Sequence, residues 1–175
     1  NMTNYLLDRG HKKIGFVGTR LMTPSIDDRF FGYLKALMER GIKYRADWII
    51  DDRDNIYGKM NYDRQFILPK EVPTAFFCNC DKAASLIIRK LEEAGYSVPG
   101  DVSVVGFDNF EYDQEADIGI TTYEINIGEM AKRAVHIMLH KMQNALYSAG
   151  VFSIQGKIIE RESVKKIGKS VPYAK

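Results

Sequence analysis

Cysteine, clustered charge and long apolar runs are all scarce in this sequence, and each scarcity excludes a class of protein. No stretch approaches the ~20 apolar residues of a membrane-spanning helix, and the first residues lack the basic and apolar regions of a signal peptide. The net charge of +2 provides no broad electrostatic surface for duplex DNA or an anionic membrane. We therefore expect a cytoplasmic protein that does not contact a membrane.

Cys78 and Cys80 are the only cysteines. Two residues apart on a strand, they would share one face, and this spacing rarely allows a disulfide. Two thiolates without further cysteines or clustered histidines do not make a zinc site. Reduced cysteines, as in the cytoplasm, are the simplest interpretation.

The sequence also lacks the common signatures of enzymes. It contains no Gly-x-Ser-x-Gly nucleophile elbow, no Gly-x-x-x-x-Gly-Lys phosphate loop and no Gly-x-Gly-x-x-Gly after the first predicted strand. His136 and His140 lie four apart in a predicted helix, a spacing that can hold a metal, but no metalloprotease-type glutamate lies between them. We interpret them as a helix-surface pair, and we expect no catalytic residue, cofactor or metal.

The sequence repeats an order of helix, glycine and strand. Gly10, Gly41 and Gly95 each follow an amphipathic stretch, as glycine does just past the end of a helix. Residues 102–106 are apolar or small without alternation, which is typical of a strand buried on both faces. The pattern predicts an α/β fold: a doubly wound parallel sheet with helices on both faces. The four predicted core strands are residues 13–18, 47–50, 73–78 and 102–106.

Apolar stripes at helical spacing predict the main helices, and weaker patterns predict the remaining elements. Residues 55–68 suit a helix with a ragged start, and residues 110–117 suit an acidic turn. The last ten residues are basic and are expected to be loose. The main helices are predicted at residues 26–40, 84–94 and 126–147. Two later strands are predicted at residues 118–123 and 151–161.

Polar residues follow each predicted core strand, at the point where the strand ends. The carboxyl ends of parallel strands gather on one edge of a sheet, where open α/β folds bind ligands. Carboxylates and amides there, with Arg29 one turn into a helix, suit a neutral polyhydroxylated ligand. The residues at this edge are Gly18-Thr19-Arg20, Asp51-Asp52-Arg53, Asn79-Cys80-Asp81 and Asp108-Asn109.

Each of these side chains has a purely structural alternative. Asp81 can cap the helix that follows it, Asp51 and Asp52 can end a strand in solvent, and Arg29 can pair with a surface acid. Asp108 is harder to explain structurally, because a carboxylate beside a core strand is costly to bury unless something binds it.

Several segments together resemble the effector-binding domain of the lactose-repressor (LacI/GalR) family of transcriptional regulators. They follow the family's order through residues 3–165, and the combination is more specific than any one segment. The segments are Gly10-His11-Lys12-Lys13-Ile14-Gly15-Phe16-Val17-Gly18, Arg29-Phe30-Phe31-Gly32-Tyr33, Phe77-Cys78-Asn79-Cys80-Asp81, Pro99-Gly100-Asp101-Val102-Ser103-Val104-Val105-Gly106-Phe107-Asp108-Asn109, Thr121-Thr122-Tyr123 and Glu160-Arg161-Glu162-Ser163-Val164.

The resemblance implies a periplasmic-binding-protein-like sensor of type I. In this family a small-molecule effector, a sugar or other small metabolite, is held between two lobes, and we expect a sugar here. Family members respond by changing how paired heads bind operator DNA, which implies a homodimer. Arg29 and Asp108 would be the principal effector contacts. Cys80 stands where the family usually has asparagine. The further candidate contacts are Thr19, Ser25, Cys80, Asp81 and Asn109.

By the same resemblance, the whole chain, residues 1–175, is a partial sensor domain without the DNA-binding head. Residues 11–109 and 150–165 would form the core of the second lobe. Residues 1–10 and 116–148 would belong to a first lobe that is mostly absent. The long helix would then lack its usual cover, and we expect its apolar stripe to pack against a second copy.

Two other functions fit the same fold. A solute-binding protein of a sugar transport system would have the same lobes, but the missing export signal and the Arg-Glu-Ser ending favour the regulator. A small doubly wound enzyme would need a nucleophile, cofactor loop or metal at the strand edge, and the sequence offers none.

Overall fold

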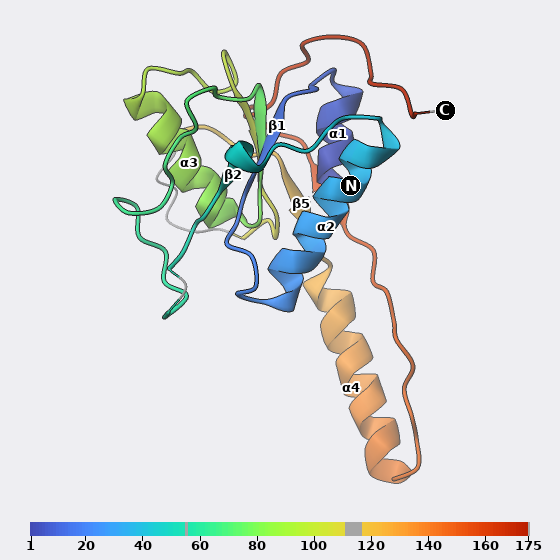
Figure 1. Cartoon of the computed structure of the whole chain (residues 1–175). Helices are drawn as coiled ribbons and strands as arrows, with labels where there is room; N and C mark the ends of the chain where they lie inside the picture. The colour runs from blue at the N-terminus through green and yellow to red at the C-terminus, as the bar shows by residue number, and fades with distance from the viewer. Residues whose placement is uncertain (55, 111–116, 175) are drawn as a thin grey trace.

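Helices and strands alternate through most of the chain, as the glycine punctuation predicts (Figure 1). The computed structural model describes residues 1–54, 56–110 and 117–174. Its helices are α1 (Met2–Asp8), α2 (Pro24–Glu39), α3 (Asp81–Glu93) and α4 (Ile127–Gln143), with one 3-10 turn, η1 (Ala46–Trp48). Its strands are β1 (Ile14–Val17), β2 (Ile49–Ile50), β3 (Ala75–Cys78), β4 (Ser103–Val105), β5 (Thr122–Glu124) and β6 (Lys157–Ile159).

The central sheet is parallel throughout, which confirms the predicted fold class. Its strand order is β2-β1-β3-β4, and every neighbouring pair runs in the same direction. Parallel bridges from Val105 to Thr121 and from Asp108 to Glu124 place β5 alongside the end of β4. The antiparallel β6 pairs with β5. The carboxyl ends of the four core strands therefore lie on one edge, where the sequence places its polar residues.

Each face of the sheet has its own apolar core. On one face, α3 and residues from the segment between β2 and β3, including the fully buried Phe66, pack on Phe76 and Cys78. On the other, α1 and α2 pack on Phe16 and Phe77. Figure 1 shows α3 on one side of the strands and α1 with α2 on the other. This alternation along β1 and β3 is what two buried faces require.

Glycine ends three of the helices in the way the sequence predicts. Gly10, Gly41 and Gly95 have φ of +91°, +65° and +84°, a left-handed conformation that glycine adopts without strain. The start of α2 is set by Thr23, whose hydroxyl accepts a hydrogen bond from the backbone N–H of Ile26. A Ser or Thr cap of this kind satisfies one of the free N–H groups of the first turn.

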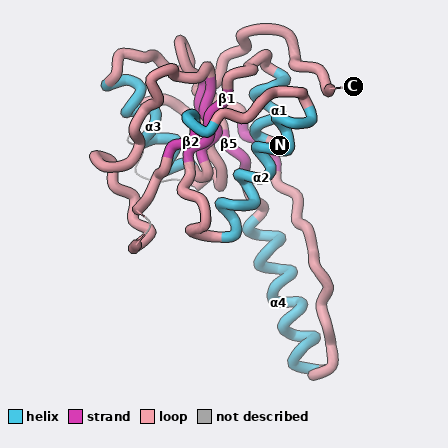
Figure 2. The backbone as a smooth tube through the Cα atoms, viewed as in Figure 1, coloured by secondary structure: helices cyan, strands magenta, loops and turns pink. Residues whose placement is uncertain are grey.

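The prediction of a helix at residues 55–68 is wrong within the described residues, because residues 56–68 form turns and irregular segments (Figure 2). The carboxylate of Asp54 accepts from the backbone N–H groups of Ile56 and Lys59, and Gly58 has a φ of +65°. Side chains that bond nearby backbone groups compete with helix formation. The acidic turn predicted at residues 110–117 falls, apart from its two end residues, outside the described part of the chain.

The carboxyl-terminal tail is held in place, which contradicts the prediction that the last ten residues are loose. The backbone N–H of Ile167 donates to the carbonyl of Arg9 at 2.9 Å, and that of Val171 donates to Leu7 at 2.9 Å. The Val171 side chain is buried in the core that contains α1 and α2. Backbone hydrogen bonds and the buried Val171 side chain therefore hold the described tail against the end of α1.

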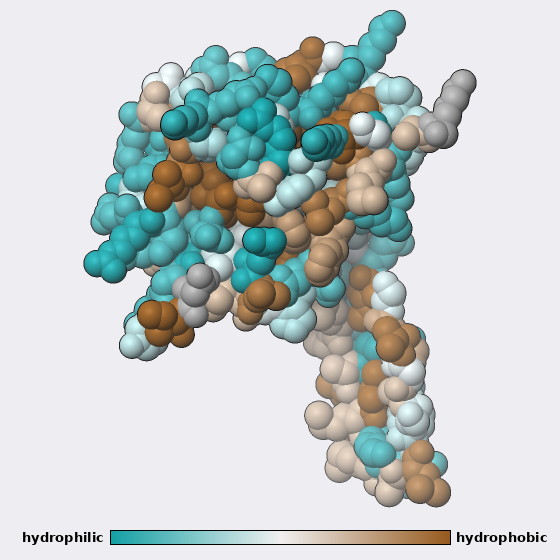
Figure 3. Space-filling model, in the orientation of Figure 1, coloured by the Kyte–Doolittle hydropathy of each residue, from teal (hydrophilic) through white to brown (hydrophobic). Residues whose placement is uncertain are grey.

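The helix α4 extends away from the sheet as an arm, with the segment leading to β6 beside it (Figure 1). None of its residues is buried, although it has exposed apolar side chains such as Met138 and Leu139. Figure 3 shows hydrophobic residues along the arm. Within the described residues, no helix is long and apolar enough to cross a membrane.

Candidate functional site

The two residues singled out in the sequence, Arg29 and Asp108, meet at the carboxyl edge of the sheet. Nη2 of Arg29 donates to Oδ1 of Asp108 at 3.1 Å, although 79 residues separate the two positions. The guanidinium also lies 4.1 Å above the ring of Phe107. Both side chains remain partly exposed. The parallel sheet creates this pair, because the first part of α2 and the end of β4 share the same edge.

Asp108 sits in a backbone conformation that few residues adopt. Its φ is +98°, and that of the next residue, Asn109, is +51°. Left-handed conformations are unfavourable for residues with a side chain, and consecutive ones persist only where surrounding contacts hold them. The backbone N–H of Asp108 donates to the carbonyl of Tyr123 at 2.9 Å. Burial raises the pKa of Asp108, and the charge of Arg29 opposes that rise.

Asn109 directs its side chain away from Arg29. Its Nδ2 donates to Oε1 of Glu124 at 2.8 Å, and its Oδ1 accepts from Nη2 of Arg161 at 2.7 Å. The structure thus brings Asn109 to the site edge, but both polar atoms of its amide are engaged within the protein.

Asp81 is the first residue of α3 and is close enough to Asp108 for the charge of Asp108 to affect its pKa. Cys80 occupies the N-cap position without a side-chain bond, so the alternative of Asp81 as the cap is wrong. Asp81 Oδ2 accepts from the backbone N–H of Phe110 at 3.1 Å, while Oδ1 is buried without a hydrogen-bond partner. Burial raises the pKa of Asp81 to about 6, against the opposing effect of a Thr122 hydrogen bond.

The two cysteines are free and buried. Burial raises the pKa of the Cys80 thiol to about 11 and also raises the pKa of Cys78. Both are therefore neutral thiols at ordinary pH, and Cys80 lies at the site edge as a small apolar group rather than as a strong hydrogen-bonding group.

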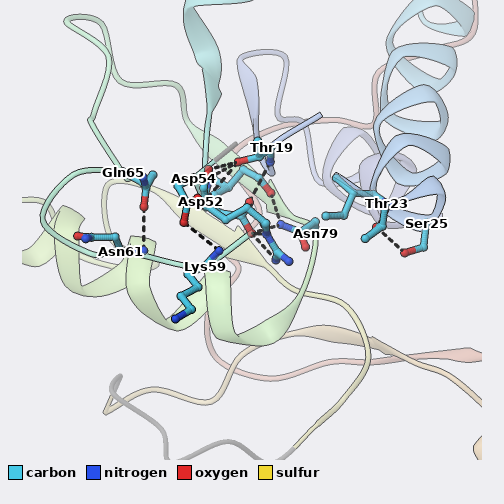
Figure 4. A network of polar contacts seen from close by, with 12 residues as sticks. Thr19, Thr23, Ser25, Asp52, Asp54, Lys59, Asn61, Gln65 and Asn79 are labelled. Atoms are coloured by element: carbon cyan, nitrogen blue, oxygen red, sulfur yellow. Dashed lines mark hydrogen bonds and ion pairs between the residues drawn. The ribbon is translucent and has the colours of Figure 1, made fainter. Parts of the chain in front are cut away.

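Thr19, Asp52 and Asn79 form a buried network where β1, β2 and β3 end (Figure 4). The Asp52 carboxylate accepts from the Thr19 backbone N–H at 2.9 Å and from Asn79 Nδ2 at 2.8 Å. The Thr19 hydroxyl donates to the carbonyl of Arg53. Asp52 is fully buried, so the expectation that it ends a strand in solvent is wrong, whereas its neighbour Asp51 is exposed.

Hydrogen bonds decide the charge of Asp52. Burial alone would raise its pKa, but bonds from Arg53, Asn79 and the Thr19 N–H hold the pKa below its ordinary value. The network therefore fastens three strand ends together around a carboxylate that stays ionised. Thr19 contributes to this fastening through both its backbone and its hydroxyl.

Ser25 is exposed in the first turn of α2, with its hydroxyl 3.1 Å from that of Thr23. It therefore joins neither the buried network nor the Arg29–Asp108 pair through a described hydrogen bond.

Among the cavities at this edge, two are lined by candidate contact residues. The larger, about 530 Å³, is lined by Asp108, Asn109, Glu124, Asn126 and Lys157, among others. A second, about 320 Å³, is lined by residues that include Thr19, Arg20, Phe31 and Asp51. Volumes of this order suit small metabolites. Asp108 is the one residue of the predicted pair that lines the larger cavity.

Sequence reasoning missed Glu124, Lys157 and Arg161 as residues of the site. Glu124 pairs with Lys157 at 3.1 Å, and Arg161 contacts Asn109. The signal available in the sequence was the Glu160-Arg161-Glu162-Ser163 segment, but nothing local indicates that it lies beside Asp108.

Comparisons with known proteins agree on the family. A family model described as "Periplasmic binding protein-like domain" matches residues 3–164. Over 160 residues the chain is 33% identical to the "NTD biosynthesis operon regulator NtdR" of Bacillus subtilis, covering 91% of this chain and 49% of that protein. It is 31% identical to the "HTH-type transcriptional repressor PurR" of Photobacterium profundum over 165 residues, covering 94% and 49%.

A solved structure, a LacI-type transcription regulator from Bifidobacterium animalis subsp. lactis, is 27% identical with a TM-score of 0.76. The match covers 94% of this chain and 62% of that one. The chain thus spans about half the length of the curated relatives it matches.

Proposed function

Since the chain belongs to the periplasmic binding protein-like domain family, we propose that it is part of the effector-sensing domain of a LacI/GalR-type transcriptional regulator. The observation that carries this proposal is the Arg29–Asp108 pair at the carboxyl edge, with a cavity of about 530 Å³ beside Asp108. The relatives are regulators, which favours this function over a transport protein or an enzyme.

The chemistry of the pair supports a polyhydroxylated effector, and we propose a sugar. The Asp108 carboxylate accepts hydrogen bonds from hydroxyl groups, and the Arg29 guanidinium donates to hydroxyl or ring oxygens in a fixed geometry. In the structure the Arg29 guanidinium and the Asp108 carboxylate form an ion pair with each other at 3.1 Å. A sugar that bridges the two would replace one ion pair with several charge-assisted hydrogen bonds, without leaving either charge unpaired.

The proposed division of the chain follows the family's two lobes. Residues 11–109 and 150–165 would form the second lobe, and residues 1–10 and 116–148 would contribute to the first. Operator DNA would be bound through a head that these 175 residues do not include. The protein would then act in the cytoplasm, and the effector would change how that head engages DNA.

A binding experiment on the complete regulator tests the proposal. Thermal shift against a panel of mono- and disaccharides, with a purine base included, should identify a compound that raises the melting temperature. Arg29→Ala and Asp108→Ala should abolish the response while the unliganded protein still unfolds cooperatively. Asp28→Ala, an exposed neighbour of Arg29 in α2, is the matched control and should respond normally.

The outcomes separate the parts of the proposal. A normal response in either site variant contradicts the site. A response to the purine alone contradicts the sugar class and leaves the sensor function intact. Turnover of a panel compound contradicts the non-enzymatic function.

The homodimer is a separate proposal, supported by the uncovered apolar side chains of α4. We propose that a second copy covers them, because a contiguous apolar face of this kind is rarely left in water. Sedimentation across a range of concentrations should show association. Met138→Glu should weaken it and Lys132→Glu should not. A monomer at high concentration would contradict the proposal.

A further inference from the structure

The turn that carries Asp108 is joined to two different parts of the molecule. The Asp108 side chain faces Arg29 of α2. The Asp108 backbone N–H and the Asn109 side chain instead contact β5, and the Asn109 side chain also contacts the chain just after β6. The helix α4 lies between these two strands in the sequence. The peptide unit between Asp108 and Asn109 therefore connects the candidate effector contact with the base of the arm.

Both partners of Asn109 are themselves fixed to the paired strands. Arg161 uses Nη1 to donate to the carbonyl of Ile120 at 2.7 Å, and its backbone N–H donates to the Thr121 hydroxyl at 2.9 Å. Glu124 pairs with Lys157, its register partner across β5 and β6. A shift of the Asn109 side chain would therefore act on both strands rather than on one mobile side chain.

The backbone of the turn is also strained. Asp108 and Asn109 both have positive φ, and each such residue stores of order 1 kcal/mol of backbone strain unless contacts compensate it. The Asn109 amide supplies two compensating contacts, one with each partner. A change in the contacts of Asp108 therefore acts on a strained turn whose conformation the Asn109 hydrogen bonds help to hold.

From these contacts we propose that Asn109 is a positioning residue that couples the Arg29–Asp108 pair to the orientation of β5 and β6, and hence of α4. This rests on the proposed function, in which the pair contacts the effector and α4 belongs to the other lobe. An effector that draws the Asp108 carboxylate away from Arg29 moves the adjoining peptide. Asn109 then passes that displacement to Glu124 and Arg161. Its amide makes one hydrogen bond with each of these two partners, which is the contact that the positioning role requires.

The coupling can be measured without knowing the effector. Asp108→Asn removes the ion pair with Arg29 and imitates loss of that contact. Amide hydrogen exchange of the 175-residue chain, detected by NMR, reports on β6 and on the Arg161 N–H. We expect Asp108→Asn to speed exchange there about fivefold. In an Asn109→Ala background the same change should have an effect of less than about twofold.

Two controls separate coupling from a merely structural role. The Arg29 Nε–H resonance should shift on Asp108→Asn in both backgrounds, which shows that the ion pair is lost in each. Asn126→Ala removes another asparagine nearby, the cap of α4, and should leave the fivefold response intact.

Independent effects would overturn the coupling: if Asp108→Asn speeds exchange equally with and without Asn109, the residue is only structural. No change in β6 on Asp108→Asn would also overturn it. Because no ligand is used, this result is independent of the saccharide panel, and a failed panel would leave the coupling standing.

Discussion

At the scale of single residues, the site edge contains two buried carboxylates whose environments shift their pKa values in opposite directions. Asp52 receives hydrogen bonds from Asn79, Arg53 and the Thr19 N–H, which lower its pKa despite burial. Asp81 has one oxygen without a partner, and burial raises its pKa. The contrast shows that the number of donors, rather than depth alone, decides the direction in which the pKa of a buried carboxylate shifts here.

Asp81 makes stability depend on pH. Its pKa is about 6 in the folded chain and about 3.9 when unfolded, so the folded state binds more protons between these values. Stability therefore falls as pH rises through about 4 to 6. Asp81→Asn removes this dependence. Relative to the wild type it should gain on the order of 2–3 kcal/mol by pH 7 and little at pH 4.

Urea unfolding of the wild type and of Asp81→Asn at several pH values measures the difference in their free energies of unfolding. Taking this difference removes the contribution of the other titrating groups, which both proteins share. Asp28→Asn, exposed on α2, is the control and should give no pH-dependent gain. A gain for Asp81→Asn of the same size at pH 4 and pH 7 would contradict the assignment.

The network around Asp52 is expected to stabilise the fold, so removing one of its members should lower the free energy of unfolding. Asn79→Ala removes the donor to Asp52 and a second bond to the Val17 carbonyl, leaving a buried charge under-satisfied. We expect a loss of about 2–3 kcal/mol in the free energy of unfolding. Ser25→Ala, which changes an exposed hydroxyl, should stay within about 0.5 kcal/mol. Equal effects of the two changes in chemical denaturation would show that the network is not a stabilising element.

At the scale of helices and strands, local patterns were sufficient where burial is regular. Runs such as Val102 to Gly106 predict the core strands, and glycine at position 41 predicts a helix end. The patterns failed where local side-chain bonds to the backbone or distant contacts decide the conformation. Residues 56–68 carry aromatics at helical spacing, yet the Asp54 carboxylate and Gly58 favour turns. The tail looks loose in sequence, but its backbone partners lie about 160 residues earlier.

The site divides in the same way. Arg29 and Asp108 were predictable because a parallel sheet brings strand ends to one edge, and this needs no side-chain detail. The contacts of Asn109 were not, because its partner Arg161 follows the antiparallel strand β6, whose position the order of the parallel core strands does not determine. The burial of Asp52 depends equally on donors from two other strand ends.

Two helix-ending glycines provide a matched test of packing by the tail. A Cβ on Gly10 would lie 2.7 Å from the backbone of Gly168, whereas one on Gly41 would meet only Ala174 at 3.5 Å. Both have positive φ, so each alanine costs about 1–2 kcal/mol in backbone strain. Gly10→Ala should lose a further 1–3 kcal/mol, about the cost of overpacking. Equal melting temperatures for the two variants would mean that the carboxyl-terminal tail around Gly168 moves to accommodate the added Cβ without a loss of stability.

At the scale of the whole molecule, the structure consists of a sheet with two cores and an arm that shares neither. The helix α4 has no buried residue, while β5 and β6 at its base are joined to the site edge through Asn109. The arm therefore adds little to the stability of the sheet but is connected to the residues of the candidate site. Such an arrangement suits a part that transmits a signal to another body.

Removing the arm tests that division. Glu124 and Lys157 are register partners, so an Asn-Gly turn in place of residues 125–156 can join β5 to β6 as a hairpin. The shortened chain should melt within about 5 °C of the full chain, because no buried contact of α4 is lost. It should also remain monomeric at concentrations where the full chain associates, since the apolar side chains of α4 are gone. Circular dichroism melting and sedimentation measure the two effects separately. A shortened chain that fails to fold would mean that the arm stabilises the sheet, and one that still associates would place the dimer contact elsewhere.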